Sequence, residues 1–424
     1  MNKKITADIL VAGFALFAMF FGAGNLIFPP YLGYDSSSNW LLGVMCFVAI
    51  DIGLSLLGII AVAKTGRGAQ GITEHLGKFF SVLLLCVNTI CLGPLIAIPR
   101  TAATTFEFGI APIFPGVSSW IFSIIFFAIV VVLSLKQTRA VDIIGSILAP
   151  IMLVALLVLI IKGVVSPLGS PDIVTQTQTV VKSGILAGYQ TMDMMGAIIM
   201  ALAIISNVSD KGYTEPKQQF KIIVLAGLVS AAALFVVYGG LAYLGATAST
   251  VIPAGVGQSS LLIAITKGLL GQNGILLLGI IVAFACLTTA VGLLTSSATF
   301  FATITHGKLP YTVTVFVFAI FSCVVSNFGI STIIAFAAPI LELIYPVLVV
   351  LIVLSLFDKI TNTNVHKLAA LAAFITSFLS LLELWTGLNL GISYLPLEQY
   401  GFPWLLPAVI FGIVGGFIKD RKKI

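Results

Sequence analysis

Apolar runs, each long enough to cross a lipid bilayer, recur along the whole of this sequence. A membrane-spanning helix needs about 20 predominantly apolar residues, and twelve such runs can be marked. They lie at about 8–33, 39–62, 79–99, 117–135, 141–161, 184–209, 222–244, 274–304, 310–328, 330–356, 368–387 and 403–419. Only 8% of the 424 residues are charged, whereas soluble domains are about 25% charged. The sequence therefore predicts an all-α polytopic membrane protein with twelve transmembrane helices.

Lysine and arginine residues predict the orientation of these helices. If the N-terminus is cytoplasmic, 17 of the 21 basic residues fall on the inner side, and Arg100, Lys162, Lys182 and Lys267 fall on the outer side. Cytoplasmic loops carry an excess of basic residues, so we expect both termini in the cytoplasm. The net charge of +6 follows from this topology and predicts no nucleic-acid partner. The basic tail KDRKK (419–423) is expected near anionic membrane lipid.

Several other classes of protein lack support in the sequence. No Walker-type phosphate-binding motif occurs, so we expect no ATP hydrolysis. The five cysteines do not have the paired spacing of a disulfide framework or a zinc site. A channel would need a continuous polar stripe, and a membrane-embedded enzyme would need a nucleophile–base pair or metal ligands. The spans offer neither, so we expect a protein that is not an enzyme and has no cofactor.

The first apolar run is interrupted near its centre. The stretch MFFGAGNLIFPP (19–30) contains Gly22, Gly24 and a Pro-Pro pair. Glycines let the backbone leave a helix and let a ligand approach it, and prolines fit the first turn of a new helix. Irregular backbone at membrane depth is tolerated where it lines a polar cavity. The run therefore predicts two half-helices around an unwound segment Gly22–Asn25; taken alone, a packing glycine pair with a proline kink is the alternative.

A second interruption occurs five helices later, in AGYQTMDMMGA (187–197). It contains Gly188, Gly196 and Asp193 near mid-helix. Because five is odd, the second block of helices starts on the opposite side of the membrane, which predicts an inverted repeat. Paired interrupted segments in the two halves point to the binding site of a secondary transporter. Free N–H groups at such breaks suit a carboxylate and free carbonyls suit an ammonium or a sodium ion, so an amino acid is the expected ligand.

Three acidic residues lie well inside expected spans, away from their ends: Asp51, Asp193 and Glu342. Charge inside a bilayer is costly and often functional. Asp193 is the strongest candidate because it coincides with the second break. It could bind the ammonium of a substrate, anchor the unwound segment, carry a coupling proton, or cap the second half-helix. Asp51 and Glu342 are either proton-relay groups or protonated packing residues.

Two further pairs are candidates for a cation site and a gate. Thr288 and Thr289 lie at the middle of the eighth run. Adjacent hydroxyls there can complete a sodium site with freed carbonyl oxygens, or they can bond back to their own helix. Arg100 is expected at the outer end of the third helix, seven residues before Glu107. The two could form an outer-gate ion pair, or Arg100 could be a snorkelling helix-end residue.

Several motifs together resemble one family. The stretches FGAGNLIFPP, GPLIAIPRTAATTFE, GYQTMDMMGA and CLTTAVGLLTSS, in this order, are similar to those of the bacterial branched-chain amino acid:cation symporters, the BrnQ-type carriers. The element GAGN also resembles the G-x-G-N break of LeuT-type transporters. The resemblance implies a LeuT-like 5+5 inverted repeat with discontinuous helices 1 and 6 plus two extra helices. One transporter domain would span 1–424, with repeats at about 8–161 and 184–356 and the extra helices at 368–419.

The resemblance also implies an activity and a set of site residues. The activity is uptake of leucine, isoleucine and valine across the bacterial plasma membrane, driven by a sodium or proton gradient. The implied substrate-binding residues are Gly22, Ala23, Gly24, Asn25, Tyr189, Thr191, Met192 and Asp193, and the implied sodium ligands are the backbone carbonyls of Ala18 and Phe21 with Thr288 and Thr289. One departure concerns the arginine that neurotransmitter-type carriers place shortly after the asparagine. Here Leu26, Ile27 and Phe28 follow Asn25, so an outer gate would be built differently, from Arg100.

These expectations combine into a symporter that works by alternating access. Sodium is favoured as the coupling ion because of the midplane hydroxyl pair and the lack of histidine within the expected spans, whereas Asp193 keeps proton coupling open. The alternatives are an amino-acid exchanger or a LeuT-fold carrier of another small zwitterionic or apolar substrate. Membrane lipid and the amino acid are the expected partners, and no obligate protein partner is indicated. The preference among leucine, isoleucine and valine, the stoichiometry and the oligomeric state stay open.

Overall fold

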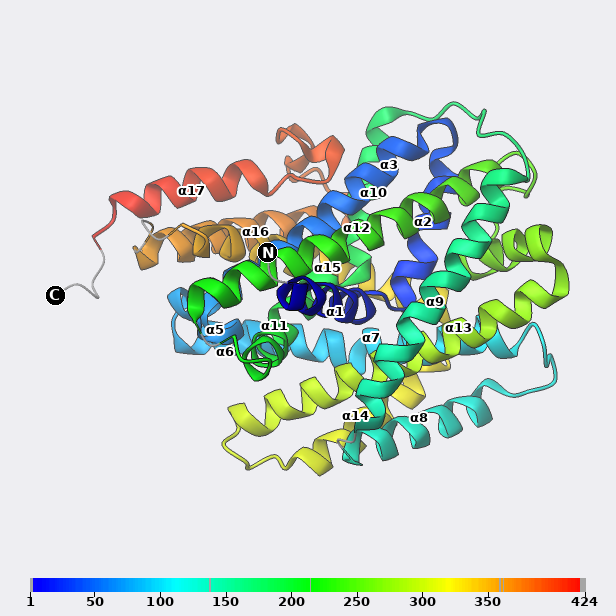
Figure 1. Cartoon of the computed structure of the whole chain (residues 1–424). Coiled ribbons are helices and arrows are strands. Elements are labelled where there is room, and N and C mark those ends of the chain that lie inside the picture. The colour runs from blue at the N-terminus through cyan, green and yellow to red at the C-terminus, as the bar shows by residue number, and fades with distance from the viewer. Residues whose placement is uncertain (1–2, 137–138, 214, 358–359, 361, 420–424) are drawn as a thin grey trace.

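The computed structural model describes residues 3–136, 139–213, 215–357, 360 and 362–419, and every regular element in this part of the chain is helical. The all-α prediction is therefore confirmed. Figure 1 shows the helices as a bundle in which early segments lie beside segments from the middle of the chain, such as α2 beside α12. The basic tail lies outside the described residues except for Lys419.

Many of these helices are suited to a lipid environment. By length and composition, six helical stretches in the described part of the chain are apolar enough to cross a membrane, and further apolar helices are shorter. The six stretches are Ala23–Thr65, Lys78–Ile110, Lys217–Ala248, Gln258–Ile304, Ile330–Ser355 and Thr363–Thr386. This composition supports a multi-pass membrane protein.

Every expected apolar run overlaps at least one helix of the structure, although the bounds of the helices differ from those of the runs. In the first half they are α1 (Lys3–Phe20), α2 (Ala23–Ser36), α3 (Trp40–Val48), α4 (Leu54–Thr65), α5 (Gly68–Thr73), α6 (Lys78–Ile90), α7 (Ala97–Thr105), α8 (Ser119–Lys136) and α9 (Arg139–Val165). Later helices are α10 (Thr177–Thr191), α11 (Asp193–Asp210), α12 (Pro216–Ala248), α13 (Gln258–Ile304), α14 (Tyr311–Ser326), α15 (Ile330–Ser355), α16 (Thr363–Thr386) and α17 (Leu405–Phe417). Short π turns, η2 (Ala49–Gly53), η4 (Cys91–Leu95) and η5 (Phe106–Ile110), follow α3, α6 and α7, and the chain is kinked at Gly93 between α6 and α7.

The first break is shorter than expected. Only Phe21 and Gly22 separate α1 from α2, and Ala23–Asn25 is already helical. Gly22 has an extended backbone, and its N–H donates to the side-chain oxygen of Asn25 at 3.2 Å. The Pro-Pro pair lies inside α2, not in its first turn. The prediction of an unwound Gly22–Asn25 segment is therefore wrong in extent, because the Asn25 side chain caps the new helix one turn early.

The second break is a single residue. Met192 adopts a left-handed conformation with φ 66° between α10 and α11. Gly188 and Gly196 both stay helical. A Cβ at Gly188 would lie 2.6 Å from Ile50 Cγ2, so this glycine permits close packing of α10 against the segment around η2. The chain turns at Met192, and the flanking glycines are not part of the turn.

Close backbone contacts fix α2 against α12. A Cβ at Gly33 would lie 1.9 Å from the carbonyl oxygen of Ala242, and a Cβ at Gly245 would lie 1.8 Å from that of Pro30. Small residues at helix crossings allow this approach in membrane proteins. The half-helix that follows the first break is thus held along its length by α12.

The eighth expected run begins earlier than the sequence indicates. Its helix α13 starts at Gln258 and is bent at Gly271, where φ is 66°. The segment before the bend, which precedes the expected run, is packed into the bundle, since Leu261, Leu262 and Ile265 are fully buried.

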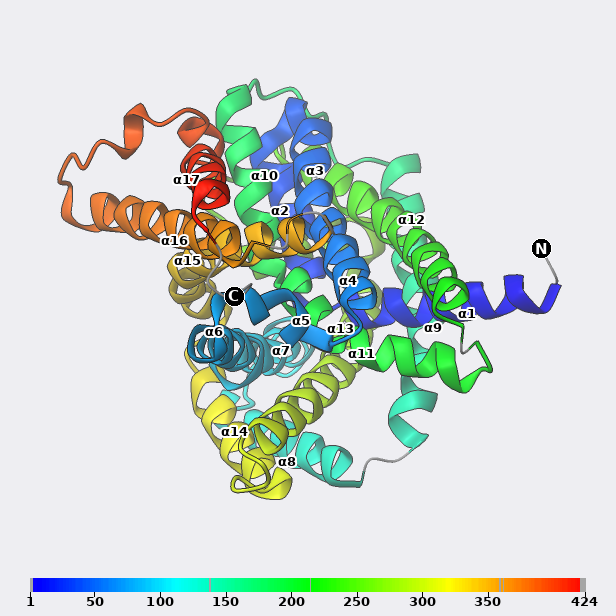
Figure 2. The same cartoon turned by 90° about the vertical axis from the view of Figure 1, so that its left-hand side faces the viewer.

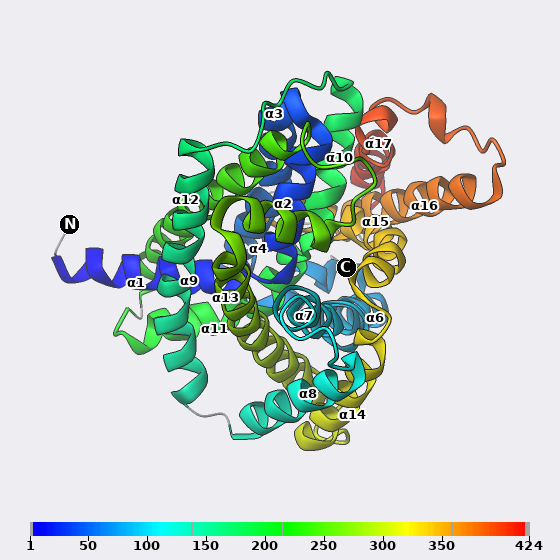
Figure 3. The ribbon, with the colours of Figure 1, turned by 90° about the vertical axis from the view of Figure 1, so that its right-hand side faces the viewer.

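The first and last helices, α1 and α17, lie at the edge of the bundle. Figures 2 and 3 show α1 reaching sideways, away from the other helices, with the N-terminal end at its tip. The side chain of Asp8 on α1 meets the loop after α11: its Oδ2 accepts from the Tyr213 hydroxyl at 2.6 Å, and its Oδ1 lies 3.9 Å from Lys211 Nζ. At the other end, α16 and α17 pack against each other beside α15.

Candidate functional site at the two helix breaks

The two breaks meet through the side chain of Asn25. Its Nδ2 donates to Asp193 Oδ2 at 2.8 Å, and it also donates to the hydroxyl of Tyr238 on α12. Its Oδ1 accepts the N–H of Gly22. Asn25 is buried, with 1% of its surface exposed. Both donors of this amide are therefore used by protein groups in this structure, and Asn25 holds the site together.

Asp51 lies at the same junction, which the sequence does not indicate. It sits in the π turn η2, and its Oδ1 accepts from the Thr191 hydroxyl at 2.6 Å. Its Oδ2 has no hydrogen-bond partner in the described part of the chain although the residue is 1% exposed. Asp51, which is buried, and Asp193, which is half-buried, border one narrow gap together with Ser55 and Ser230, and this gap has no room for a water molecule. Two carboxyl groups, from residues 142 positions apart, thus border the same gap.

Arg100 is not at the outer end of a helix. It lies within α7 and is 4% exposed. Its Nη1 donates to the carbonyl oxygen of Gln190 at 2.6 Å, and its Nη2 donates to that of Thr191 at 3.2 Å. These carbonyls form the C-terminal end of α10, where the helix dipole favours a positive charge. Arg100 therefore caps the half-helix before the second break.

The expected ion pair between Arg100 and Glu107 is wrong. Glu107 Oε1 accepts the N–H of Ile330, and its Oε2 accepts from the Ser259 hydroxyl. Seven helical residues rise about 10 Å, so the two side chains reach different neighbours. The snorkelling alternative is also wrong, because the guanidinium is buried at the second break.

The glycines of the first break make room for two of these groups. A Cβ at Gly24 would lie 3.0 Å from Arg100 Nη2, and one at Gly22 would lie 3.5 Å from Thr289 Oγ1. Thr289 Oγ1 is buried without a hydrogen-bond partner in the described chain. The Thr288 hydroxyl instead donates to carbonyls of its own helix, Phe284 at 3.1 Å and Ala285 at 2.9 Å. Of the two threonines, only Thr289 is next to the break. Thr288 follows the alternative expectation, in which the hydroxyl bonds back to its own helix.

A cavity of about 40 Å³ lies where the breaks meet. Its walls come from both breaks and from α7, α11 and α13, and the lining residues include Met19, Gly22, Asn25, Leu92, Arg100, Thr191, Met192, Asp193, Met200 and Thr289. One water molecule accounts for about 30 Å³ of liquid, so an amino acid enters only if side chains withdraw. Methionine side chains are flexible enough to do so.

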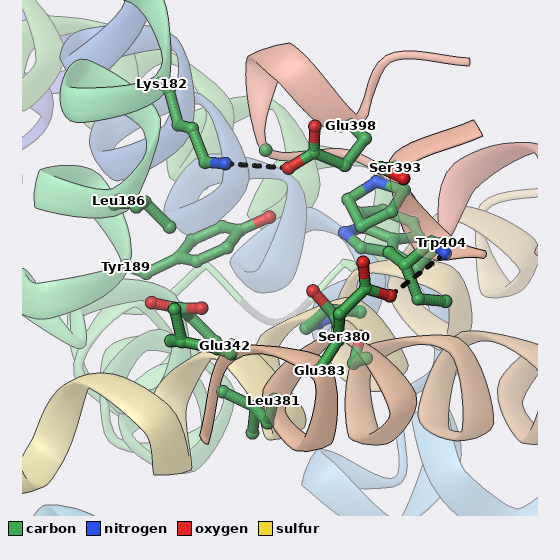
Figure 4. A pocket seen from close by; sticks show the side chains of 16 residues that line it. Lys182, Leu186, Tyr189, Glu342, Ser380, Leu381, Glu383, Ser393, Glu398 and Trp404 are labelled. Atoms are coloured by element: carbon green, nitrogen blue, oxygen red, sulfur yellow. Dashed lines mark hydrogen bonds and ion pairs between the residues drawn. The ribbon is translucent and has the colours of Figure 1, made fainter. Parts of the chain in front are cut away.

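Two predicted site residues lie elsewhere. Tyr189 is outside this cavity; its ring packs against that of Tyr345 at 4.5 Å between centroids. Tyr189 and Glu342 both line a second, larger cavity (Figure 4). Tyr189 lies on the face of α10 that points away from the first break.

Tyr238 is a site residue that sequence reasoning missed. Its ring lies 6.5 Å from that of Phe21 and 5.2 Å from that of Phe47, and its hydroxyl meets Asn25. The only signal in the sequence is a polar hydroxyl at the middle of an apolar span. Such a hydroxyl needs a partner when buried, but the partner cannot be identified without the fold.

Comparison with known proteins identifies the family of this chain and several relatives. The family model for branched-chain amino acid transport proteins matches residues 5–422. The branched-chain amino acid permease BraB of Bacillus subtilis (strain 168) is 37% identical over 423 residues, covering 96% of this chain and 94% of BraB. The branched-chain amino acid permease BrnQ of Escherichia coli (strain K12) is 35% identical over 428 residues, covering 98% and 96%. These relatives are permeases, which confirms the prediction that the chain is not an enzyme.

Solved structures share the fold. Mhp1, a nucleobase-cation-symport-1 family transporter in a closed conformation, superposes with a TM-score of 0.66 at 14% identity over 96% of this chain and 91% of that one. A Na⁺-coupled sialic acid symporter gives 0.63 at 15% identity, over 98% and 91%. MhsT in complex with L-phenylalanine gives 0.59 at 16% identity, over 96% and 97%. At these identities the likeness shows the LeuT-like fold alone.

Proposed function

The chain belongs to the family of branched-chain amino acid transport proteins, and from this premise we propose that it imports leucine, isoleucine and valine by symport with sodium. The observation that carries the proposal is the contact between Asn25 and Asp193, which joins the two breaks at one point. A substrate bound there touches both halves of the molecule. Alternating access then follows from movement of one half against the other around that point.

The ends of the half-helices supply the contacts for a zwitterion. The first turn of α2, Ala23–Asn25, presents free N–H groups and a positive dipole end to a carboxylate. Arg100 already occupies the carbonyls of Gln190 and Thr191, so the ammonium is left with Asp193 and the end of α1. An aliphatic side chain fits among Met192, Leu92 and their neighbours. This division of contacts favours a neutral amino acid with an apolar side chain.

Sodium is the favoured coupling ion because of Thr289. Its hydroxyl, which has no partner among the described residues, lies beside Gly22, close to the end of α1, where the carbonyls of Ala18 and Phe21 would complete the oxygen ligands. Moving one positive charge through the membrane field releases about 2.3 kcal/mol per 100 mV. That energy concentrates a neutral substrate about fiftyfold.

Proton coupling is the second candidate, and a separate observation favours it. Asp51 and Asp193 border one narrow gap, and Asp51 Oδ2 has no hydrogen-bond partner among the described residues. Two carboxyl groups held together away from water favour sharing one proton. Release of that proton to the cytoplasm would then accompany release of the substrate.

The topology is part of the proposal. We place both termini in the cytoplasm of a bacterial cell and count twelve spans, with repeats at 8–161 and 184–356 and an extra pair at 368–419. The breaks at Gly22 and Met192 fall in corresponding first helices of the two repeats, which supports an inverted arrangement.

Uptake of radiolabelled leucine into proteoliposomes tests this function. We expect accumulation with an inward sodium gradient at equal pH on both sides. We expect none with a proton gradient in sodium-free buffer, and none without gradients when the vesicles hold unlabelled leucine. Accumulation only with the proton gradient would mean that protons drive uptake, through the carboxyl groups of Asp51 and Asp193. Accumulation under the third alone would make the protein an exchanger.

A further inference from the structure

A cavity of about 360 Å³ lies apart from the breaks, at the end of the bundle where α10 begins. Figure 4 shows its walls: α10, α15, α16 and the segment between α16 and α17. The proposed topology puts this end on the external side. Small-molecule sites have volumes of about 300–1,000 Å³, so the cavity is large enough for a free amino acid.

The charged residues of this cavity leave one carboxylate free for a ligand. Lys182 Nζ pairs with Glu398 Oε1 at 2.9 Å. Glu383 Oε2 accepts the N–H groups of Leu390 and Ile392 at 3.2 and 3.1 Å. Glu342 lines the cavity wall and accepts no hydrogen bond within the described part of the chain. Its carboxylate suits an ammonium group.

The cavity also has buried hydrogen-bond donors that need an acceptor. The indole N–H of Trp404 and the hydroxyls of Tyr189 and Ser377 have no hydrogen-bond partner in the described chain. All three residues are at most 4% exposed, and Figure 4 shows the Tyr189 hydroxyl directed into the cavity. Tyr189 and Trp404 line the same cavity. Buried donors without acceptors are rare and costly, and a carboxylate oxygen between them would satisfy both.

The remaining lining is apolar, from Leu186, Pro346, Leu381 and Ile392. We infer that this cavity is a second amino-acid site, which binds a zwitterion with an aliphatic side chain through Glu342 on one side and Trp404 with Tyr189 on the other. The inference rests on the proposed function, because it gives the same substrate a second place to bind. Tyr189 directly precedes Gln190, whose carbonyl Arg100 holds, so a ligand here contacts the half-helix that ends at the second break.

Binding stoichiometry tests the inference. In equilibrium dialysis of purified protein against radiolabelled leucine, we expect two sites per chain. Trp404→Phe keeps an aromatic ring and removes the N–H, and we expect one site. Trp385→Phe is the matched control, because Trp385 is 65% exposed on α16 and does not line the cavity; it should keep two. One site in the unaltered protein, or two in Trp404→Phe, would overturn the inference.

A variant of the breaks separates this inference from the proposed function. Gly24→Leu places a side chain against Arg100 and should abolish uptake while one leucine still binds. That remaining leucine should change tryptophan fluorescence in Gly24→Leu and not in Gly24→Leu/Trp404→Phe. Normal uptake by Gly24→Leu would contradict the proposed function and leave the second site standing. Loss of all leucine binding by a folded Gly24→Leu protein would overturn the second site.

Analogues of leucine test the chemistry of recognition in Gly24→Leu. Leucinol lacks the carboxylate and N-acetyl-leucine lacks the ammonium. We expect each to displace labelled leucine at least tenfold less well than leucine does. Glu342→Gln should remove the penalty for N-acetyl-leucine and keep the penalty for leucinol. Equal potency of all three compounds would overturn the assignment of Glu342 and Trp404.

Discussion

Single residues at the junction divide into those that organise it and those with unused polar atoms. Asn25 and Arg100 use their donors on protein groups, Asn25 on Asp193 and Tyr238, and Arg100 on two carbonyls. Thr289 Oγ1 and Asp51 Oδ2 have no such partners in the described chain. We therefore expect organising residues to control whether the site forms, and the other two to control ion dependence.

The adjacent threonines of α13 give a test of ion binding at the residue scale. Thr289→Ala removes the hydroxyl beside Gly22, whereas Thr288→Ala removes one that bonds back to its own helix. We expect the sodium concentration for half-maximal leucine uptake to rise about tenfold or more in Thr289→Ala, since a lost ligand of about 1.4 kcal/mol has that effect. Thr288→Ala should stay within about twofold. Equal effects of the two substitutions would mean that the sodium ion does not bind at Thr289.

Arg100 and Glu107 give a second residue-scale test. Arg100→Lys keeps the charge but cannot donate to two carbonyls in a fixed fork, and hydrogen bonds to charged groups contribute about 1.5–3 kcal/mol each. We expect leucine uptake to fall at least tenfold in Arg100→Lys. Glu107→Gln keeps an acceptor for Ile330 or Ser259 and should retain most uptake. If the two formed a gate, both variants would share one defect, and that result would contradict the separate contacts described above.

At the scale of elements, glycine-lined contacts decide which helices can move separately. Gly33 and Gly245 let α2 and α12 touch through their backbones, whereas Gly239 on α12 has no atom within 4 Å of a Cβ. Substitutions at these positions therefore differ in steric cost although the residue type is the same.

Alanine substitutions on α12 measure that cost. A Cβ at Gly245 would overlap the carbonyl of Pro30, and overpacking costs about 1–3 kcal/mol or more. We expect Gly245→Ala to lower the melting temperature and the yield of monodisperse protein in detergent. Gly239→Ala should be neutral or slightly stabilising, because alanine favours a helix over glycine. A normal melting temperature for Gly245→Ala would show that the two helices separate more easily than the structure indicates.

Some of these elements follow from the sequence and some depend on the fold. The positions of both breaks were predicted, because glycine, proline and polar residues inside apolar runs have few other uses. Their extent was not, since the Asn25 side chain caps α2 early and Met192 alone makes the second turn. Arg100 was misplaced because the third apolar run was expected to end at residue 99, whereas α7 and the π turn η5 continue the helix to Ile110. The meeting of Asp51 with Thr191 depends on tertiary packing.

At the scale of the whole molecule, the first half of one broken helix, α1, is tied to the second half of the other, α11. Asp8 on α1 accepts from Tyr213 and lies near Lys211, both in the loop that follows α11. Hydrogen bonding to Asp8 raises the pKa of Tyr213, so the hydroxyl remains a donor at neutral pH. Movement of α1 is thereby linked to movement of α11.

A tyrosine variant tests this link. Tyr213→Phe removes the hydroxyl donor to Asp8, and we expect the maximal rate of leucine uptake to change at least twofold while equilibrium leucine binding stays unchanged. Tyr311→Phe is the matched control, because the Tyr311 hydroxyl donates to the carbonyl of Ser134 away from α1. Equal rates in both variants and in the unaltered protein would mean that the tie to Asp8 does not influence the transport cycle.

The backbone contact between α2 and α12 has a consequence for ligands that act from outside the site. Because Gly33 meets Ala242, Gly245 meets Pro30 and Tyr238 meets Asn25, we expect these two helices to move as one body. An antibody or compound that binds only α2 and α12 moves with them and does not stop transport. An antibody or compound that binds both this pair of helices and a helix that moves separately holds the transporter in the conformation to which it binds. Blocking antibodies or compounds should therefore be selected for epitopes that span that boundary.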